Sequence, residues 1–118
     1  MRDHKNLEAF KLADEVAVMV YKITAGYPKS EIYGLTAQMR RAAVSSASNI
    51  VEGCTRISQN EFLRFLEISF GSMKELHYQF NLSFRLGYCD KTEYEQGDKK
   101  MEEAEKVISG LINKVRRK

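Results

Sequence analysis

The chain has 118 residues, of which 43% are hydrophobic and 30% are charged, and this balance fits one globular domain and excludes a disordered segment. One proline, no tryptophan and few glycines make a composition that tolerates long helices. The net charge of +3 permits an anionic partner without requiring one.

The first predicted helix spans residues 7–25. Its apolar residues, from Ala9 to Ile23, recur at helical spacing on one side, and charged residues occupy the other side. Gly26 and Pro28 end this helix, because glycine accepts the left-handed conformation there and proline cannot continue the hydrogen-bond ladder.

The second predicted helix spans residues 36–53, with Thr36 as its N-cap. Between Ala42 and Ser48 nearly every side chain is small. Small side chains allow a neighbouring helix to approach closely, and the weak amphipathic pattern indicates contacts on more than one side.

The third predicted helix spans residues 59–86. Ser58 and Glu61 form a capping-box pattern at its start, and Gly87 ends it. Seven large apolar residues form a broad face for a bundle core: Phe62, Phe65, Leu66, Met73, Leu76, Phe80 and Phe84. A second apolar set lies off that face, among or beside the charged residues: Ile68, Tyr78, Leu82 and Leu86. One bundle core does not need so much apolar surface, so we expect the second set to form an oligomer interface.

The fourth predicted helix spans residues 91–115, and Asp90 with Glu93 forms another capping pattern before it. Its apolar residues make a narrow stripe, the rest is densely charged, and Gly97 and Gly110 should weaken it locally. Four helices with short connections favour antiparallel neighbours. The sequence therefore predicts an all-α fold, an antiparallel up-down-up-down four-helix bundle formed by a single domain over residues 1–118.

Few residues suit catalysis or metal binding. The histidines are His4, near the start of the chain, and His77. The residue three positions before His77 is Lys74, whereas a di-metal bundle motif needs a glutamate there. No glycine-rich phosphate loop and no zinc-type spacing of cysteine or histidine is present in the sequence. We expect a structural role for His77, and no enzymatic activity, cofactor or metal.

The cellular compartment also follows from the sequence as an expectation. No apolar run reaches the roughly 20 residues that a membrane span requires, and the charged first residues do not fit a signal peptide. We therefore expect a cytoplasmic protein without a membrane partner. Thiols stay reduced in that compartment, so free buried side chains are expected for Cys54 and Cys89 in preference to a disulfide.

The middle of the chain is mildly basic, with six basic and four acidic side chains in residues 35–89. The six are candidates for nucleic-acid binding, because arginine and lysine hold phosphates without reading the base sequence. They are Arg40, Arg41, Arg56, Arg64, Lys74 and Arg85. The competing interpretation is a solvated surface with ordinary ion pairs to the four acidic residues: Glu52, Glu61, Glu67 and Glu75. In a symmetric ring each basic residue is repeated around the axis, so the binding hypothesis depends on assembly.

The second predicted helix also carries a recognisable pattern. Residues 33–45 read Tyr-Gly-Leu-Thr-Ala-Gln-Met-Arg-Arg-Ala-Ala-Val-Ser, and Ser-Asn-Ile at 48–50 and Glu-Gly at 52–53 follow. This block resembles the four-helix-bundle family of proteins encoded by intervening sequences in bacterial 23S ribosomal RNA genes, often labelled S23 ribosomal protein. Shorter matches, such as Tyr-Pro at 27–28 and Leu-Gly-Tyr at 86–88, extend the resemblance over nearly the whole chain. The accessory variability protein of diversity-generating retroelements looks like a relative.

The resemblance implies an up-down bundle that assembles into a ring-like homo-oligomer, expected to be a pentamer, with a basic surface. In the retroelement branch it implies binding to nucleic acid and to a reverse transcriptase. Arg40, Arg41 and Arg56 stand where the family favours basic residues. Ser46 and Ala47 replace an Ile-Pro pair common in the family, so no proline kink is expected.

Two functions are compatible with these patterns. The first is a non-enzymatic homo-oligomer that binds RNA or DNA through a basic surface formed on assembly. The alternative is a protein–protein scaffold or accessory module without nucleic-acid binding. The ribosomal label does not decide between them, because a protein encoded within a ribosomal RNA gene need not be a ribosome component.

Overall fold

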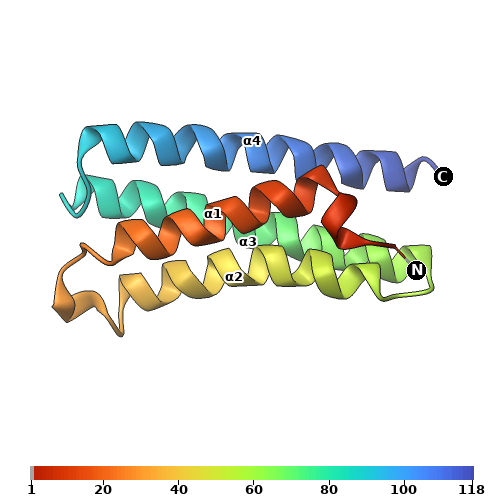
Figure 1. Cartoon of the computed structure of the whole chain (residues 1–118), viewed down its shortest axis with the longest axis horizontal. Coiled ribbons are helices and arrows are strands. Elements are labelled where there is room, and N and C mark those ends of the chain that lie inside the picture. Colours follow the sequence, from red (N-terminus) through yellow and green to blue (C-terminus); the bar gives the residue numbers. More distant parts are fainter. Residues whose placement is uncertain (1) are drawn as a thin grey trace.

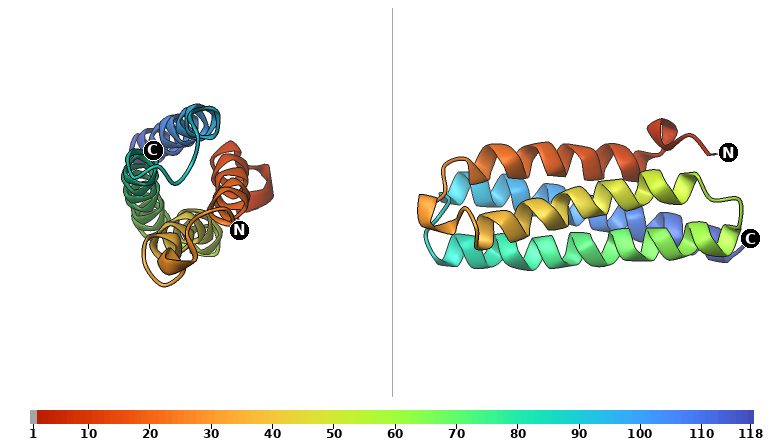
Figure 2. Two further views of the ribbon diagram at one scale, coloured as in Figure 1. Left: turned by 90° about the vertical axis from the view of Figure 1, so that its left-hand side faces the viewer. Right: turned by 90° about the horizontal axis from the view of Figure 1, so that it is seen from below.

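Four long helices run alternately up and down in the computed structural model, which describes residues 2–118 (Figure 1). They are α1 (Glu8–Thr24), α2 (Leu35–Cys54), α3 (Gln59–Arg85) and α4 (Lys91–Arg116). Two short 3-10 helices, η1 (His4–Asn6) and η2 (Lys29–Glu31), precede α1 and α2. The bundle measures 44 × 24 × 19 Å, and α4 packs back against α1 to close it (Figure 2). The predicted all-α up-down-up-down bundle is confirmed.

Each predicted helix end lies within one residue of the observed end. The prediction that Thr36 is the N-cap of α2 is wrong. α2 begins at Leu35, and Thr36 lies inside its first turn, 2% exposed. The cap comes from Glu31, whose Oε1 accepts a hydrogen bond from the Leu35 N–H at 3.0 Å. Gly34 stands at the N-cap position and has no side chain, so a residue of the preceding 3-10 helix supplies the acceptor.

The other predicted helix ends are formed as their residue types indicate. Ser58 Oγ accepts a hydrogen bond from the Glu61 N–H at 3.3 Å, and Asp90 with Glu93 forms a complete capping box. Gly87 has a φ of +82° just beyond α3, a left-handed conformation that favours glycine.

α2 and α3 approach each other closely because small residues line the seam between them. Ser69 Oγ donates to the Ser46 carbonyl at 2.7 Å, and Ser46 Oγ donates to the Ser69 carbonyl at 3.0 Å. At the far end of α2, a Cβ on Gly53 would lie 2.8 Å from Phe65 Cβ. The expected close approach at the small-residue segment of α2 is therefore observed.

The apolar core runs the length of the bundle, and its largest fully buried side chains include Phe80, Met39 and Leu66. Cys54 and Cys89 are free and buried, as expected. Within residues 2–118, no helix combines the length and the apolar character needed to cross a bilayer. Both chain ends lie at one end of the bundle, and the connection between α1 and α2 lies at the other end (Figure 1).

Candidate nucleic-acid interface

The six predicted basic residues differ in how they are paired. Arg56 Nη2 lies 3.1 Å from Glu52 Oε1, and Lys74 Nζ lies 3.7 Å from Glu105 Oε1 on α4. The other four form no ion pair in the part of the chain that the structure describes: Arg40, Arg41, Arg64 and Arg85. Four of the six cations are therefore available to an anionic partner.

The acidic residues of the same segment are only partly used to neutralise these cations. Glu52 pairs with Arg56, whereas Glu67 pairs with Arg116 on α4. Glu61 and Glu75 form no ion pair within residues 2–118. Four arginines but only two glutamates of residues 35–89 therefore lack an ion-pair partner. Of the ion pairs that the competing interpretation predicts within this segment, only Arg56–Glu52 is formed.

Arg40 is set apart from the other cations by its contacts. Its Nε donates to Thr24 Oγ1 at 2.9 Å, and its guanidinium carbon lies 4.7 Å from the centroid of the Tyr21 ring. Both partners belong to α1. The half-buried Arg40 side chain therefore points to the α1 side of α2, away from α3.

The outer surface of α2 and α3, here called the α2–α3 surface, comprises basic and apolar side chains and two carboxylates. Its members are Arg41, Val44, Glu61, Arg64, Ile68, Glu75, Tyr78, Leu82, Arg85 and Leu86. Ile68 is 41% exposed, Tyr78 61% and Leu86 51%, whereas Leu82 is half-buried. The predicted interface residues thus lie outside the core, and predicted phosphate-binding residues are interspersed among them along α3.

The spacing of the cations on this surface follows from helix register. Because Ser46 lies opposite Ser69, Arg64 is level with Val51 of the antiparallel helix. Arg41 is ten residues from Val51, so Arg41 and Arg64 are separated by about 15 Å along the bundle axis. Arg85 lies on the other side of Arg41, at a similar axial distance from it. These separations exceed the Debye length of about 8 Å at physiological salt, so one protomer presents separate charges and not one continuous field.

A polar network that the sequence did not predict joins α3 to α4 beside this surface. His77 Nε2 lies 2.6 Å from Asp98 Oδ1, and its Nδ1 lies 2.7 Å from Glu105 Oε2. Burial opposes the charged form of His77, but the hydrogen bonds that Asp98 and Glu105 accept from the imidazole outweigh it and raise its pKa. His77 thus has a specific pair of anionic partners, and its structural role stays a prediction.

The same network positions two of the predicted cations. Asn81 Nδ2 donates to Tyr94 Oη at 2.7 Å, and Arg85 Nε donates to Asn81 Oδ1 at 2.8 Å. Lys74 pairs with Glu105, the same carboxylate that contacts His77. Arg85 and Lys74 therefore stand on the α4 side of α3. Asp98 and Glu105 are two turns apart, so the sequence alone places both carboxylates on one face of α4. It does not show that His77 lies opposite them.

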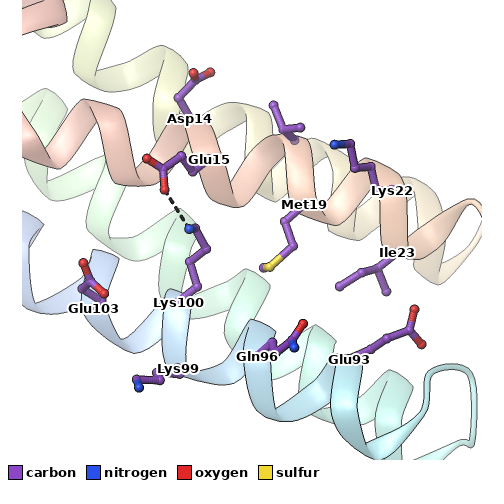
Figure 3. Close-up of a pocket in the computed structure, with 11 residues that line it drawn as sticks. Asp14, Glu15, Met19, Lys22, Ile23, Glu93, Gln96, Lys99, Lys100 and Glu103 are labelled. Atoms are coloured by element: carbon purple, nitrogen blue, oxygen red, sulfur yellow. Dashed lines mark ion pairs between the residues drawn. The ribbon is translucent and has the colours of Figure 1, made fainter.

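A groove of about 760 Å³ lies between α1 and α4 on another side of the bundle (Figure 3). Met19 and Ile23 provide apolar lining. Its charged lining is mixed: Asp14, Glu15, Glu93 and Glu103 against Lys22, Lys99 and Lys100. Lys100 Nζ lies 2.7 Å from Glu15 Oε1, the ion pair drawn in Figure 3. With four acidic and three basic residues, this groove does not suit a polyanion.

No group of three histidine, cysteine, aspartate or glutamate side chains within residues 2–118 is arranged to hold a metal ion. At His77 each ring nitrogen takes a separate carboxylate, so the three groups do not converge on a common point.

Comparison with known proteins identifies the family. The family described as 23S rRNA-intervening sequence protein matches residues 5–110. This chain belongs to that family. The recognition drawn from residues 33–53 is therefore confirmed, and the resemblance to the retroelement accessory protein stays a prediction.

A solved structure has the same architecture as this chain. A crystal structure of a protein of unknown function from the S23 ribosomal protein family of Bacteroides thetaiotaomicron superposes with a TM-score of 0.80. The two chains are 23% identical, and the match covers 89% of this chain and 95% of the other. At that identity the likeness establishes the fold alone. No curated protein matches this chain.

Proposed function

We propose that this family member is a non-enzymatic homo-oligomer that binds RNA or DNA through phosphate contacts on its α2–α3 surface. One observation carries the proposal. Arg41, Arg64 and Arg85 form no ion pair in residues 2–118, are interspersed on that surface with exposed apolar side chains, and outnumber its two carboxylates, Glu61 and Glu75. The apolar residues supply the reason to assemble, and the arginines supply the charge that assembly concentrates.

Assembly is needed because the cations of one protomer are too far apart to act together. A second copy that covers Ile68 and Leu86 would bring a second set of arginines to the edges of the covered area. Arg41 would flank it from α2, and Arg85 would flank it from the α4 side. A closed ring, expected from the family resemblance to contain five copies, repeats these pairs around its axis.

Nucleic-acid binding is tested by fluorescence anisotropy of the purified oligomer with a labelled single-stranded RNA and a DNA duplex over a salt series. The test variant carries Arg41→Gln, Arg64→Gln and Arg85→Gln. The matched control carries Lys11→Gln, Lys106→Gln and Lys114→Gln, exposed positions elsewhere. Both variants lower the basic count from 19 to 16 and bring the net charge to zero (16 against 16).

The arginine variant is expected to lose affinity by about tenfold or more for all sequences alike, and to show a shallower salt dependence. The lysine control is expected to keep most of its affinity. Equal losses of affinity in the two variants would show that binding depends on the net charge of the protein and not on the α2–α3 surface. Affinity weaker than about 1 µM at low salt, or affinity independent of salt, would contradict the proposal.

Assembly is tested by light scattering and sedimentation of the wild-type protein and of a variant with Ile68→Gln and Leu86→Gln. These two side chains are exposed in the protomer, so the substitutions should leave the fold intact. The expected result is a lower mass together with weaker nucleic-acid binding. Val18→Gln with Ile57→Gln, at exposed apolar positions off this surface, is the control. A wild-type monomer at all working concentrations would refute the assembly.

The second candidate is a protein–protein scaffold, and the exposed aromatic ring of Tyr78 favours it, since tyrosine is enriched in protein interfaces. A partner such as a reverse transcriptase would then occupy the α2–α3 surface. Nuclease treatment separates the two functions: a scaffold keeps its partner at low and high salt after nuclease digestion, whereas a complex bridged by nucleic acid dissociates.

A further inference from the structure

A second cavity, about 320 Å³ in volume, is lined by residues of the connection between α1 and α2 and of the adjoining helix ends. Figure 1 shows this connection at the end of the bundle opposite the chain ends. Its lining comes from the end of α1, the connection itself and the first turns of α2. The residues are Thr24, Ala25, Tyr27, Pro28, Lys29, Ile32, Thr36 and Arg40. The volume is at the small end of the range for ligand sites, roughly 300–1,000 Å³.

The charge of this cavity has one sign. Lys29 and Arg40 line it, and no acidic residue does. The nearest carboxylate in sequence, Glu31, is committed elsewhere, because it accepts hydrogen bonds from the Leu35 N–H and from Tyr88 Oη. This contrasts with the mixed charges of the α1–α4 groove. A cavity with two cations and no carboxylate suits an anion.

Arg40 is held in place by contacts that leave its outer edge available. Nε donates to Thr24 Oγ1, and the guanidinium lies over the Tyr21 ring. Neither contact uses Nη1 or Nη2, the pair that binds a carboxylate or phosphate in a fork. Because the side chain is already fixed, a ligand would not have to order it on binding.

Thr36 belongs to the wall of the cavity and not to its polar groups. The residue is 2% exposed, and its Oγ1 is fully buried without a hydrogen-bond partner. Because this oxygen is not accessible from the cavity, the polar contacts to a ligand come from Arg40 and Lys29.

The remaining lining is apolar and rigid. Ala25, Pro28 and Ile32 contribute apolar walls, and the Tyr27 ring closes the inner side. Tyr27 is anchored in the bundle, with its Oη 2.6 Å from Ser83 Oγ. A bare inorganic anion would leave this apolar lining unused, whereas an organic anion would cover it.

We propose that this cavity binds a small organic carboxylate. The anionic head lies between Arg40 and Lys29, and a compact apolar body packs on Pro28 and Ile32. The site is separate from the α2–α3 surface, since Arg40 points to the α1 side of α2. Its test therefore uses none of the residues varied for nucleic-acid binding.

The test is an NMR titration of the full-length ¹⁵N-labelled protein, with the backbone amide of Thr36 and the Nε–H of Arg40 as reporters. The probes are isovalerate, benzoate, the neutral benzamide and inorganic phosphate. The two carboxylates are expected to shift both reporters in a saturable way. Benzamide that shifts them equally, phosphate that shifts them as strongly as benzoate, or carboxylates that show no saturation below roughly 10 mM would overturn the proposal.

Two variants assign the interaction to named groups. Arg40→Gln is expected to raise the benzoate Kd by at least about tenfold, because it removes a forked, charge-assisted hydrogen bond, and Lys29→Gln is expected to raise it by a smaller factor. Lys99→Gln, in the α1–α4 groove, is the control and should leave the Kd unchanged. Unchanged benzoate affinity in a folded Arg40→Gln protein would refute the site. If that variant does not fold, the wild-type titration with carboxylates, benzamide and phosphate tests the proposal.

A nucleic-acid end is the competing occupant, and a competition experiment separates it from a small acid. A short 5′-phosphorylated oligonucleotide is added to the benzoate complex. Benzoate shifts that persist while the oligonucleotide binds elsewhere support the small-acid site. Displacement of benzoate by the phosphorylated oligonucleotide, but not by its unphosphorylated form, would assign Arg40 to nucleic-acid binding and overturn the proposal.

Discussion

Nδ1 of His77 lies 2.7 Å from Oε2 of Glu105, and this contact joins α3 to α4 at the edge of the core. Asp98 contacts the other ring nitrogen, Lys74 pairs with Glu105, and Tyr94 Oη donates to Asp98. The imidazole is therefore a bridge between two carboxylates of the same helix. When both ring nitrogens carry protons, each can donate to one carboxylate.

This bridge predicts that stability falls as the pH rises. Since the pKa of folded His77 is raised above its unfolded value of about 6.5, the stabilisation is fully present below that value. It is lost as the pH rises through the folded pKa. Urea denaturation from pH 5.5 to 9 should show this decline in the wild type and a flatter profile in His77→Gln. His4→Gln is the control, and a wild-type profile that rises over this range would contradict the sign.

The two glycines of α4 should respond in opposite ways to alanine. A Cβ at Gly97 would lie 2.6 Å from two ring atoms of the buried Phe80, whereas a Cβ at Gly110 would meet nothing within 4 Å. Gly97→Ala is expected to destabilise the protein by about 1–3 kcal/mol through overpacking. Gly110→Ala is expected to stabilise it by about 0.5–1 kcal/mol through helix propensity. Chemical denaturation measures both, and a Gly97→Ala protein at least as stable as the wild type would show that packing against Phe80 is not decisive.

Two buried threonines allow a test of hydrogen-bond satisfaction with the same substitution. Thr36→Val removes a hydroxyl without a partner and is expected to raise the free energy of unfolding by about 1 kcal/mol. Thr24→Val should lower it by about 1–2 kcal/mol, because Thr24 Oγ1 donates to the Val20 carbonyl and accepts from Arg40. Thermal or urea melts measure the pair. A Thr36→Val protein less stable than the wild type would mean that its hydroxyl has a partner in solution.

Both thiols should be unreactive in the native protein. Burial raises the pKa of Cys54 and of Cys89, so each is a thiol and not a thiolate at neutral pH. Cys54 is 1% exposed and Cys89 is 9% exposed. Ellman's reagent should therefore react slowly under native conditions and at once in urea, with two thiols per chain. Immediate reaction of either thiol in buffer would contradict the burial.

The helices could be predicted closely because their signals are local. Spacing of apolar residues, capping pairs at Ser58 and Asp90, and Gly87 each act within one or two turns, and the observed ends agree within one residue. Thr36 is the exception. Its residue type favours an N-cap, but the chain turns through η2 and brings Glu31 to the position where a cap is needed.

The candidate sites could be predicted less well because they depend on register between helices. The sequence identified the cations but not their partners: Lys74 pairs across to Glu105, and Arg40 turns to Thr24 and Tyr21. The cavity beside Arg40 also depends on the path of residues 25–34, which no periodic pattern encodes. The accumulation of arginines near α2 and α3 was visible in the sequence, whereas their separation along the axis was not.

The placement of the two chain ends has a practical consequence for experiments on this protein. The two chain ends lie at the same end of a molecule 44 Å long, and the connection between α1 and α2, which lines the cavity beside Arg40, lies at the other end. A surface tether, affinity tag or fluorophore attached at either end should leave the cavity open to solvent. Immobilised protein can therefore be screened against libraries of small acids without blocking their entry.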